Sequence, residues 1–119
     1  MEDITIWHNP RCSKSRNALN LIEEKKINKK VFKYLEENPS KEQITNVLKL
    51  LKISAKELLR TGEKVYKELD LKNVDNEDEL ITAMYENPKL IERPIIIIAN
   101  EAVIARPIEN MELLLKKYM

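Results

Sequence analysis

The single cysteine of the sequence, Cys12, lies among polar and cationic residues and is the side chain best suited to nucleophilic chemistry. It follows a proline-containing turn and stands just before a predicted helix that begins at Ser13. A helix N-terminus presents free N–H groups and the positive end of the helix dipole, and both favour a thiolate over a thiol. Arg11, Lys14 and Arg16 add positive charge within four residues of the sulfur. This pattern predicts an activated cysteine nucleophile.

Each residue of this cluster also has a purely structural interpretation. A lone cysteine is often a small buried hydrophobic residue without chemistry, although Cys12 does not lie within an apolar period. His8 either favours the thiolate electrostatically or braces the turn through a ring nitrogen. Ser13 and Ser15 offer hydroxyl donors to the sulfur or to an incoming anion. Arg16 either stabilises the loop, contacts the anion, or is an ordinary surface arginine.

Arginine is scarce in this chain, and three of its positions are unusual. There are five arginines against sixteen lysines. Arg60 precedes the only glycine by two residues, and Arg93 and Arg106 each precede a proline. Where lysine supplies the general surface charge, the remaining arginines are candidates for bidentate recognition of an oxyanion, the alternative being solvated surface charges. The two Arg-Pro pairs bracket a predicted hairpin, so we expect Arg93 and Arg106 at the same end of a sheet.

Two residue counts exclude several classes of chemistry. One glycine, Gly62, is too few for a dinucleotide-binding fingerprint or a Walker-type phosphate loop. One cysteine and one histidine exclude a structural zinc site built from thiolates and imidazoles, and also an intramolecular disulfide. If Cys12 does redox chemistry, the second sulfur must come from another molecule.

Length and charge bound the remaining possibilities. The chain has 119 residues and a mass of 14.0 kDa, which favours one domain over 1–119. A net charge of +1 argues against nucleic-acid and membrane partners, and no apolar run approaches the ~20 residues that span a bilayer. We therefore expect a cytoplasmic protein, and a monomer because no heptad seam is present.

The pattern of elements predicts an α/β fold with a four-stranded mixed sheet. Strands at 3–7 and 31–35 flank a helix, which is a parallel β-α-β unit. A helical insertion over about 40–88 follows, with helix starts at Ser40, Ser54 and Asn76. An apolar strand at 95–98, a turn at 100–101, a strand at 102–105 and a last amphipathic helix complete a β-β-α unit.

The active-site stretch I-W-H-N-P-R-C-S-K-S-R closely resembles the glutaredoxin-coupled arsenate reductases, as do L-L-R at 58–60, R-P-I at 93–95 and A-R-P at 105–107. The resemblance covers nearly the whole chain in order and spacing. It implies a thioredoxin-like fold with a helical insertion, with Pro94 as a cis-proline and Cys12 as the catalytic nucleophile.

The same resemblance implies a substrate, a reductant and a set of supporting residues. Arsenate, or a similar small oxyanion, is bound by Arg60, Arg93 and Arg106. Glutathione is the co-substrate and glutaredoxin the protein partner in arsenic detoxification, with no metal and no bound cofactor. The active-site loop is supported by His8, Asn9, Ser15, Arg16 and Pro94.

Two other functions remain open at this point. A glutathione-dependent thiol oxidoreductase acting on another substrate shares the cysteine loop, but it has no need for three converging arginines. The second alternative is a non-catalytic transcription regulator of the same fold, which binds RNA polymerase. Its redox-switch members typically carry Cys-x-x-Cys, where this chain has Ser15 in the second position.

Overall fold

The computed structural model describes residues 3–118, and the chain forms two compact units. Unit 1 is made of the segments Met1–Glu37 and Arg93–Met119, and unit 2 is Asn38–Glu92. Unit 2 contains the segment in which the sequence predicts a helical insertion. Residues 1, 2 and 119 of the predicted domain lie outside the described residues.

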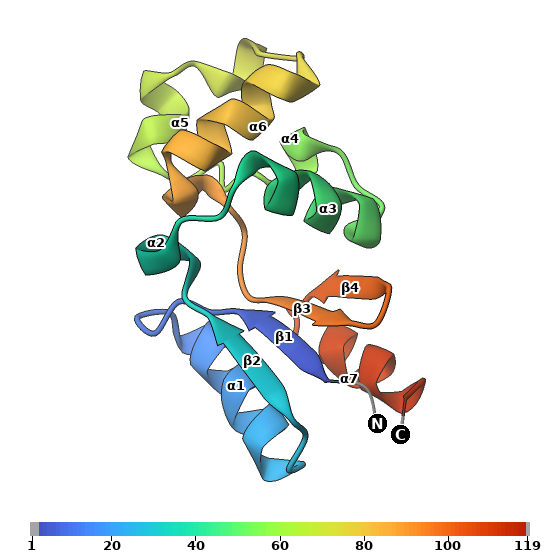
Figure 1. The fold of residues 1–119 in the computed structure, drawn as a ribbon. Coiled ribbons are helices and arrows are strands. Elements are labelled where there is room, and N and C mark those ends of the chain that lie inside the picture. Colours follow the sequence, from blue (N-terminus) through green and yellow to red (C-terminus); the bar gives the residue numbers. More distant parts are fainter. Residues whose placement is uncertain (1–2, 119) are drawn as a thin grey trace. The chain divides into compact units, whose positions relative to one another are not determined.

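Unit 1 is built on a four-stranded mixed sheet (Figure 1). Its strands are β1 (Ile4–Trp7), β2 (Lys29–Phe32), β3 (Ile95–Ile98) and β4 (Glu101–Ile104), in the order β2-β1-β3-β4. β1 pairs parallel with β2 and antiparallel with β3, and β3 pairs antiparallel with β4. The predicted mixed sheet is therefore confirmed, and its β-α-β and β-β-α halves meet where β1 lies beside β3.

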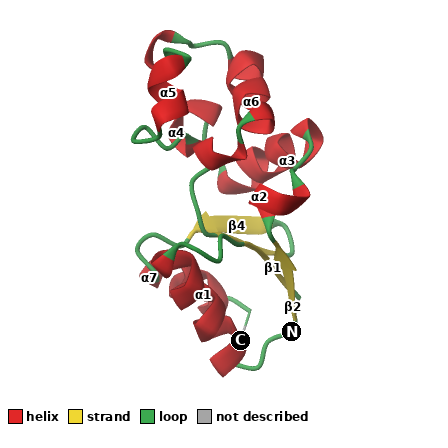
Figure 2. Cartoon of the chain, turned by 90° about the vertical axis from the view of Figure 1, so that its left-hand side faces the viewer, coloured by secondary structure: helices red, strands yellow, loops and turns green. Residues whose placement is uncertain are grey.

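Helices α1 (Ser13–Glu24) and α7 (Glu109–Lys116) both cover one face of this sheet (Figure 2). Alternation along β1 points Ile4 and Ile6 toward that face, where both are fully buried. Burial of each such side chain stabilises the fold by about 1.5–3 kcal/mol, so both helices are held firmly. The core they form contains Ile4, Ile6, Ala18, Ile22, Ile27, Ile96, Ile98, Ala105, Met111, Leu114 and Leu115.

The predicted strand at 31–35 is wrong in its position. β2 ends at Phe32, and the chain turns into a short helix, α2 (Tyr34–Glu37). The Lys33 N–H donates to the Glu37 carboxylate at 2.8 Å, which closes this turn. The aromatic residues that suggested a longer strand instead pack on Trp7, whose ring lies 5.1 Å from that of Phe32 and 6.2 Å from that of Tyr34.

The predicted hairpin is shifted by one residue. The two-residue turn is 99–100, not 100–101, and the strand expected at 102–105 is β4 at Glu101–Ile104. Ala99 takes the left-handed conformation that the turn requires, with φ of 53°. Glu101 belongs to the strand because its carboxylate is held there, accepting from Lys117 Nζ at 3.0 Å and from the Tyr118 hydroxyl.

Unit 2 is helical, and its principal helix starts follow capping signals in the sequence. Ser40 caps its helix with a complete capping box with Gln43, and Asn76 accepts from the Glu79 N–H at 3.0 Å. The five-residue helix α5 was not predicted, because it is too short to show a helical period and its N-cap residue, Glu63, makes no side-chain capping hydrogen bond. The helices of unit 2 are α3 (Lys41–Leu51), α4 (Ala55–Leu58), α5 (Lys64–Glu68) and α6 (Glu77–Glu86), with short 3-10 turns at Leu71–Asn73 and Pro88–Leu90.

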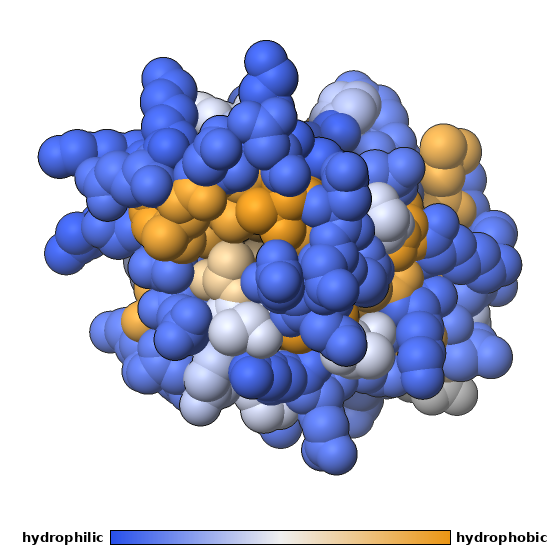
Figure 3. Space-filling model, turned by 90° about the horizontal axis from the view of Figure 1, so that it is seen from above, coloured by the Kyte–Doolittle hydropathy of each residue, from blue (hydrophilic) through white to orange (hydrophobic). Residues whose placement is uncertain are grey.

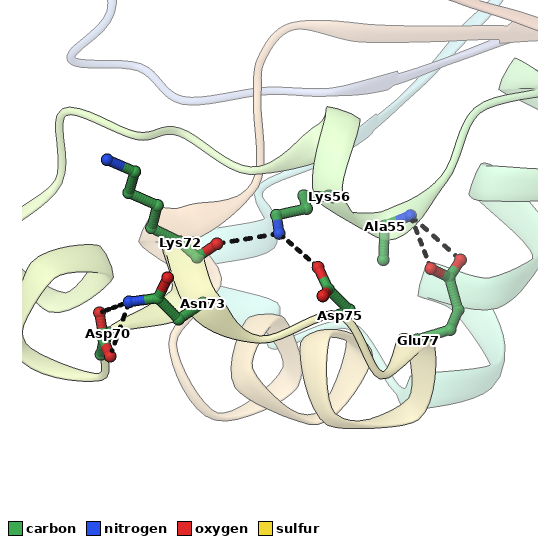
Figure 4. Close-up of polar contacts among 7 residues, drawn as sticks. All are labelled: Ala55, Lys56, Asp70, Lys72, Asn73, Asp75 and Glu77. Carbon is green, nitrogen blue, oxygen red and sulfur yellow. Dashed lines mark hydrogen bonds and ion pairs between the residues drawn. The ribbon is translucent and has the colours of Figure 1, made fainter.

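Hydrogen bonds and an ion pair connect α4 to the first residue of α6 and to the segment that precedes α6 (Figure 4). The Glu77 carboxylate accepts from the Ala55 N–H at 3.0 and 3.2 Å. Lys56 Nζ donates to Asp75 at 2.7 Å and to the Lys72 carbonyl at 3.0 Å. These contacts fix α4 and hence the residues that leave it, which include Arg60.

Unit 2 presents a mainly hydrophilic surface with some apolar side chains gathered among the polar ones (Figure 3). Its large exposed apolar residues include Leu69 and Tyr85. A groove of about 360 Å³ runs beside Leu69, Leu71 and Val74. No helix within residues 3–118 is long and apolar enough to cross a membrane.

Candidate active site

Cys12 is the residue that joins the exit turn of β1 to the N-terminus of α1. It is the N-cap, with extended backbone angles, and is 8% exposed. Its N–H donates to the Asn9 carbonyl at 3.0 Å, and its own carbonyl accepts the Arg16 N–H at 3.0 Å. The sulfur therefore lies where the unpaired N–H groups of the helix are available to it.

Arg106 and Arg93 reach this sulfur from the other chain segment of unit 1. Arg106 Nη2 lies 3.3 Å from Cys12 Sγ, and Arg106 Nε donates to the Arg93 carbonyl at 2.8 Å. The Arg93 side chain also hydrogen-bonds Cys12. The peptide bonds Arg93–Pro94 and Arg106–Pro107 are both cis. The two arginines that the sequence places at one end of the sheet thus meet at the cysteine.

The surroundings of Cys12 lower the pKa of its thiol to about 7. Burial raises the pKa, because it disfavours the charged form. The Ser15 N–H, the side chains of Arg93 and Arg106, and the Lys14 N–H donate to the sulfur and together outweigh burial. A substantial fraction of the thiol is therefore ionised at neutral pH, which is the condition for nucleophilic attack.

Ser15 and His8 form a buried brace beneath the loop. The Ser15 hydroxyl lies 2.7 Å from His8 Nδ1 and accepts the Asn9 N–H at 3.0 Å. The backbone N–H of Ser15, and not its hydroxyl, donates to the sulfur, while donation of the hydroxyl to an incoming anion stays a prediction. Burial and the charges of Lys33 and Arg16 lower the pKa of His8, so its ring is neutral at pH 7. A neutral ring braces the turn and adds no positive charge beside the thiolate.

Arg16, a cation near Cys12 in sequence, directs its side chain to the loop. Arg16 Nη1 donates to the Pro10 carbonyl at 2.9 Å, and the backbone N–H of Arg11 donates to the Asn9 side chain at 3.0 Å. The groups that lower the pKa of Cys12 are backbone N–H groups and the side chains of Arg93 and Arg106. The contribution expected from the side-chain charges of Arg11, Lys14 and Arg16 stays a prediction.

Arg60 belongs to unit 2 and is paired there with two carboxylates. Its Nη1 lies 2.9 Å from Glu92 and its Nε lies 3.4 Å from Glu63, with the side chain 21% exposed. An isolated antiparallel bridge, from Leu59 to Ile91, sets this pairing. Within unit 1 the structure brings together Cys12, Arg93 and Arg106, whereas the contacts of Arg60 are those of unit 2.

Sequence reasoning missed three polar residues that contact these arginines. Glu63 and Glu92 flank Arg60, and Asn110 donates to the carbonyls of Ile104 and Arg106 at 3.1 and 3.4 Å. The sequence feature that could have indicated Asn110 is its position near the start of the last amphipathic helix, three residues after the Arg106-Pro107 pair. Residues 3–118 contain no group of three or more His, Cys, Asp or Glu side chains placed to hold a metal ion.

The fold and the cysteine contacted by two arginines define a class of protein, and comparison of the sequence with known protein families identifies that class. The family model of the ArsC family matches residues 7–114, and the chain belongs to this family. The thioredoxin-like fold expected from the resemblance is confirmed.

Individual relatives match over nearly their whole length. The arsenate reductase of Neisseria meningitidis is 43% identical over 118 residues, which is 97% of this chain and all of that protein. The arsenate reductase of Haemophilus influenzae is 40% identical, over 91% of this chain and 95% of its own. Among solved structures, the arsenate reductase of Vibrio cholerae superposes with a TM-score of 0.88 at 41% identity, covering 92% of this chain and 94% of that one.

Proposed function

We propose that this protein is an arsenate reductase in which Cys12 is the nucleophile and the electrons come from external thiols. The observation that carries the proposal is the contact of Arg93 and Arg106 with a thiol whose pKa is lowered to about 7. The relatives named arsenate reductase, which match 97% and 91% of the chain, support arsenate as the substrate.

In the first step the Cys12 thiolate attacks arsenic(V) and one arsenate oxygen leaves as water after taking up protons. The product is a thiol–arsenate adduct, in which arsenic is still in the +5 state. The approach of an anionic nucleophile to an oxyanion is electrostatically unfavourable. The guanidinium groups of Arg93 and Arg106 offset that repulsion and stabilise the charge that shifts in the transition state.

In the second step a glutathione thiolate attacks the Cys12 sulfur. The sulfur–arsenic bond breaks, its electron pair stays on arsenic, and arsenite leaves in the +3 state. Cys12 is now in a mixed disulfide with glutathione. A glutaredoxin thiol then attacks the glutathione sulfur and releases the Cys12 thiolate. An external thiol is required because the sequence has no second cysteine.

Arg60 is proposed as a third oxyanion ligand on the strength of the sequence resemblance. Its pairing with Glu92 and Glu63 orients the guanidinium within unit 2. The monomeric state and the cytoplasmic location stay predictions from the sequence.

A coupled assay tests the proposal. Arsenate is supplied with glutathione, glutaredoxin, glutathione reductase and NADPH, and NADPH consumption is followed by absorbance. We expect consumption that depends on arsenate, on glutaredoxin and on Cys12. Activity on a glutathione mixed disulfide without any arsenate-dependent turnover would instead identify a thiol oxidoreductase. The absence of both activities would contradict an enzymatic function and favour the regulator.

A further inference from the structure

Asn110 joins the first turn of α7 to the chain segment that carries Arg106. Its side-chain amide donates to the Ile104 carbonyl at 3.1 Å and to the Arg106 carbonyl at 3.4 Å. Its backbone N–H donates to the Pro107 carbonyl at 3.1 Å. Asn110 thus donates hydrogen bonds to three carbonyls between the end of β4 and the start of α7.

The helix that carries Asn110 is firmly anchored. Met111, the next residue, is fully buried, and Leu114 and Leu115 of the same helix lie in the core beneath the sheet. Asn110 itself is half-buried on the helix. Because this helix is fixed to the sheet by its buried side chains, the Asn110 amide also fixes the positions of the carbonyls that it contacts.

The segment held by Asn110 determines where the guanidinium of Arg106 lies. Arg106 Nη2 contacts Cys12 Sγ at 3.3 Å, and its Nε contacts the Arg93 carbonyl at 2.8 Å. Both donors belong to one rigid planar group, so they reach both acceptors together only when the Arg106 backbone is correctly placed. Proline at 107 supplies no N–H of its own to fix this peptide.

We propose that Asn110 is a positioning residue that holds Arg106 against the Cys12 sulfur. This inference rests on the proposed role of Cys12 as the nucleophile. Asn110 acts through the backbone of Ile104 and Arg106 and does not touch the sulfur. Loss of its amide donors lets the Arg106 side chain leave the sulfur, and the thiolate becomes less favourable.

The test is a titration of the Cys12 thiol in Asn110→Ala and Asn110→Leu, read by thiolate ultraviolet absorbance and by the rate of alkylation with iodoacetamide. Asn110→Leu has a similar shape, no side-chain N–H donors and no added charge, so it decides the question if Asn110→Ala does not fold. We expect the thiol pKa to rise in both folded variants. At neutral pH the alkylation rate should fall several-fold and kcat for arsenate should fall more than KM rises.

Asn87→Ala is the matched control, because the Asn87 amide also donates to a backbone carbonyl, that of Ala83 at 3.2 Å, but within unit 2. We expect this variant to keep the thiol pKa of the parent protein. A similar pKa change in Asn87→Ala and Asn110→Leu would overturn the proposal, since the effect would then reflect general loss of stability.

A double-mutant cycle with Arg106→Ala separates positioning from a direct effect. If Asn110 acts through Arg106, Asn110→Leu has no further effect on the thiol pKa in the Arg106→Ala background. Additive shifts, or an unchanged pKa in folded Asn110→Leu, would contradict the inference. The titration needs no arsenate, so failure of the proposed reductase activity leaves this test intact.

Discussion

The two units hold their arginines against partners of different kind. In unit 1 Arg106 Nη2 contacts the Cys12 sulfur, and Arg106 Nε donates to the neutral Arg93 carbonyl. In unit 2 Arg60 lies between the carboxylates of Glu92 and Glu63. The comparison shows that the two guanidinium groups act on partners of different chemistry, a titratable thiol in unit 1 and a pair of carboxylates in unit 2.

This difference has an energetic basis. A cation beside a titratable thiol stabilises its charged form, which is the sense of the pKa shift at Cys12. A cation already paired with carboxylates gains less from an added anion, because those carboxylates must share or give up their hydrogen bonds. We therefore expect Arg106 to influence both the thiol and the substrate, and Arg60 to influence the substrate alone.

The largest effect is expected from removal of the sulfur. Cys12→Ser should abolish arsenate-dependent NADPH consumption in the coupled assay, because a serine hydroxyl is not ionised at neutral pH and cannot form a mixed disulfide. Asn20→Ala, a change at an exposed residue of the same helix, is the control and should keep the activity of the parent protein. Turnover of Cys12→Ser near the parent rate would overturn the assignment of the nucleophile.

The expected difference between Arg106 and Arg60 is tested most directly by truncating each side chain. Arg106→Ala should lower kcat/KM for arsenate by roughly 100-fold, the typical effect of removing one donor to a developing oxyanion, and should raise the thiol pKa. Arg60→Ala should raise KM for arsenate while leaving the rate of Cys12 alkylation unchanged. Arg11→Ala, exposed on the loop, is the control. Equal effects of Arg60→Ala and Arg106→Ala on the thiol pKa would contradict the difference.

A smaller effect on KM is expected from a change in the carboxylate that pairs with Arg60. Glu92→Gln retains an oxygen that accepts from Arg60 Nη1 but removes the negative charge that competes with an oxyanion. We expect KM for arsenate to fall by roughly five-fold, equivalent to about 1 kcal/mol, a typical worth of one hydrogen bond. Glu63→Gln should have a weaker effect, because its contact is 3.4 Å against 2.9 Å. An unchanged or higher KM in Glu92→Gln would show that the carboxylate does not compete with substrate.

The smallest effect concerns stability alone. Ser40→Ala removes the hydroxyl that accepts the Gln43 N–H at 3.1 Å and should lower the free energy of unfolding by about 1 kcal/mol. Denaturant titration measures this loss. The thiol pKa of Cys12 should stay the same, since its determinants all lie in unit 1. A shift of that pKa in Ser40→Ala would mean that unit 2 helps to set the thiol.

The sequence predicts those parts of unit 1 whose signal is local. The alternation of Ile4 and Ile6, the isoleucine run of β3 and the start of α1 after Cys12 each follow from neighbouring residues, and the structure confirms them. β2 and β4 are displaced because side chains from outside the strand pattern decide their ends. Glu37 closes the turn after β2, and Glu101 is drawn into β4 by residues at the end of α7.

The electrostatics of the site depend on contacts between segments far apart in the sequence. The arginine charges near Cys12 in sequence suggested its activation, yet Arg93 and Arg106, more than eighty residues away, contact the sulfur. The carboxylates around Arg60 depend on the bridge that pairs Leu59 with Ile91. No local pattern encodes such a register, so Glu92 was not identifiable from spacing.

The measurement closest to the central claim is the pH dependence of Cys12 alkylation by iodoacetamide in the unmodified protein. Every alkylation event reports on Cys12, because the sequence has no other cysteine. The thiolate is the reactive form, so the rate should rise with pH through a midpoint at about 7 and level off above it. A midpoint near the ordinary thiol value of ~8.5 would contradict an activated cysteine held by Arg93 and Arg106.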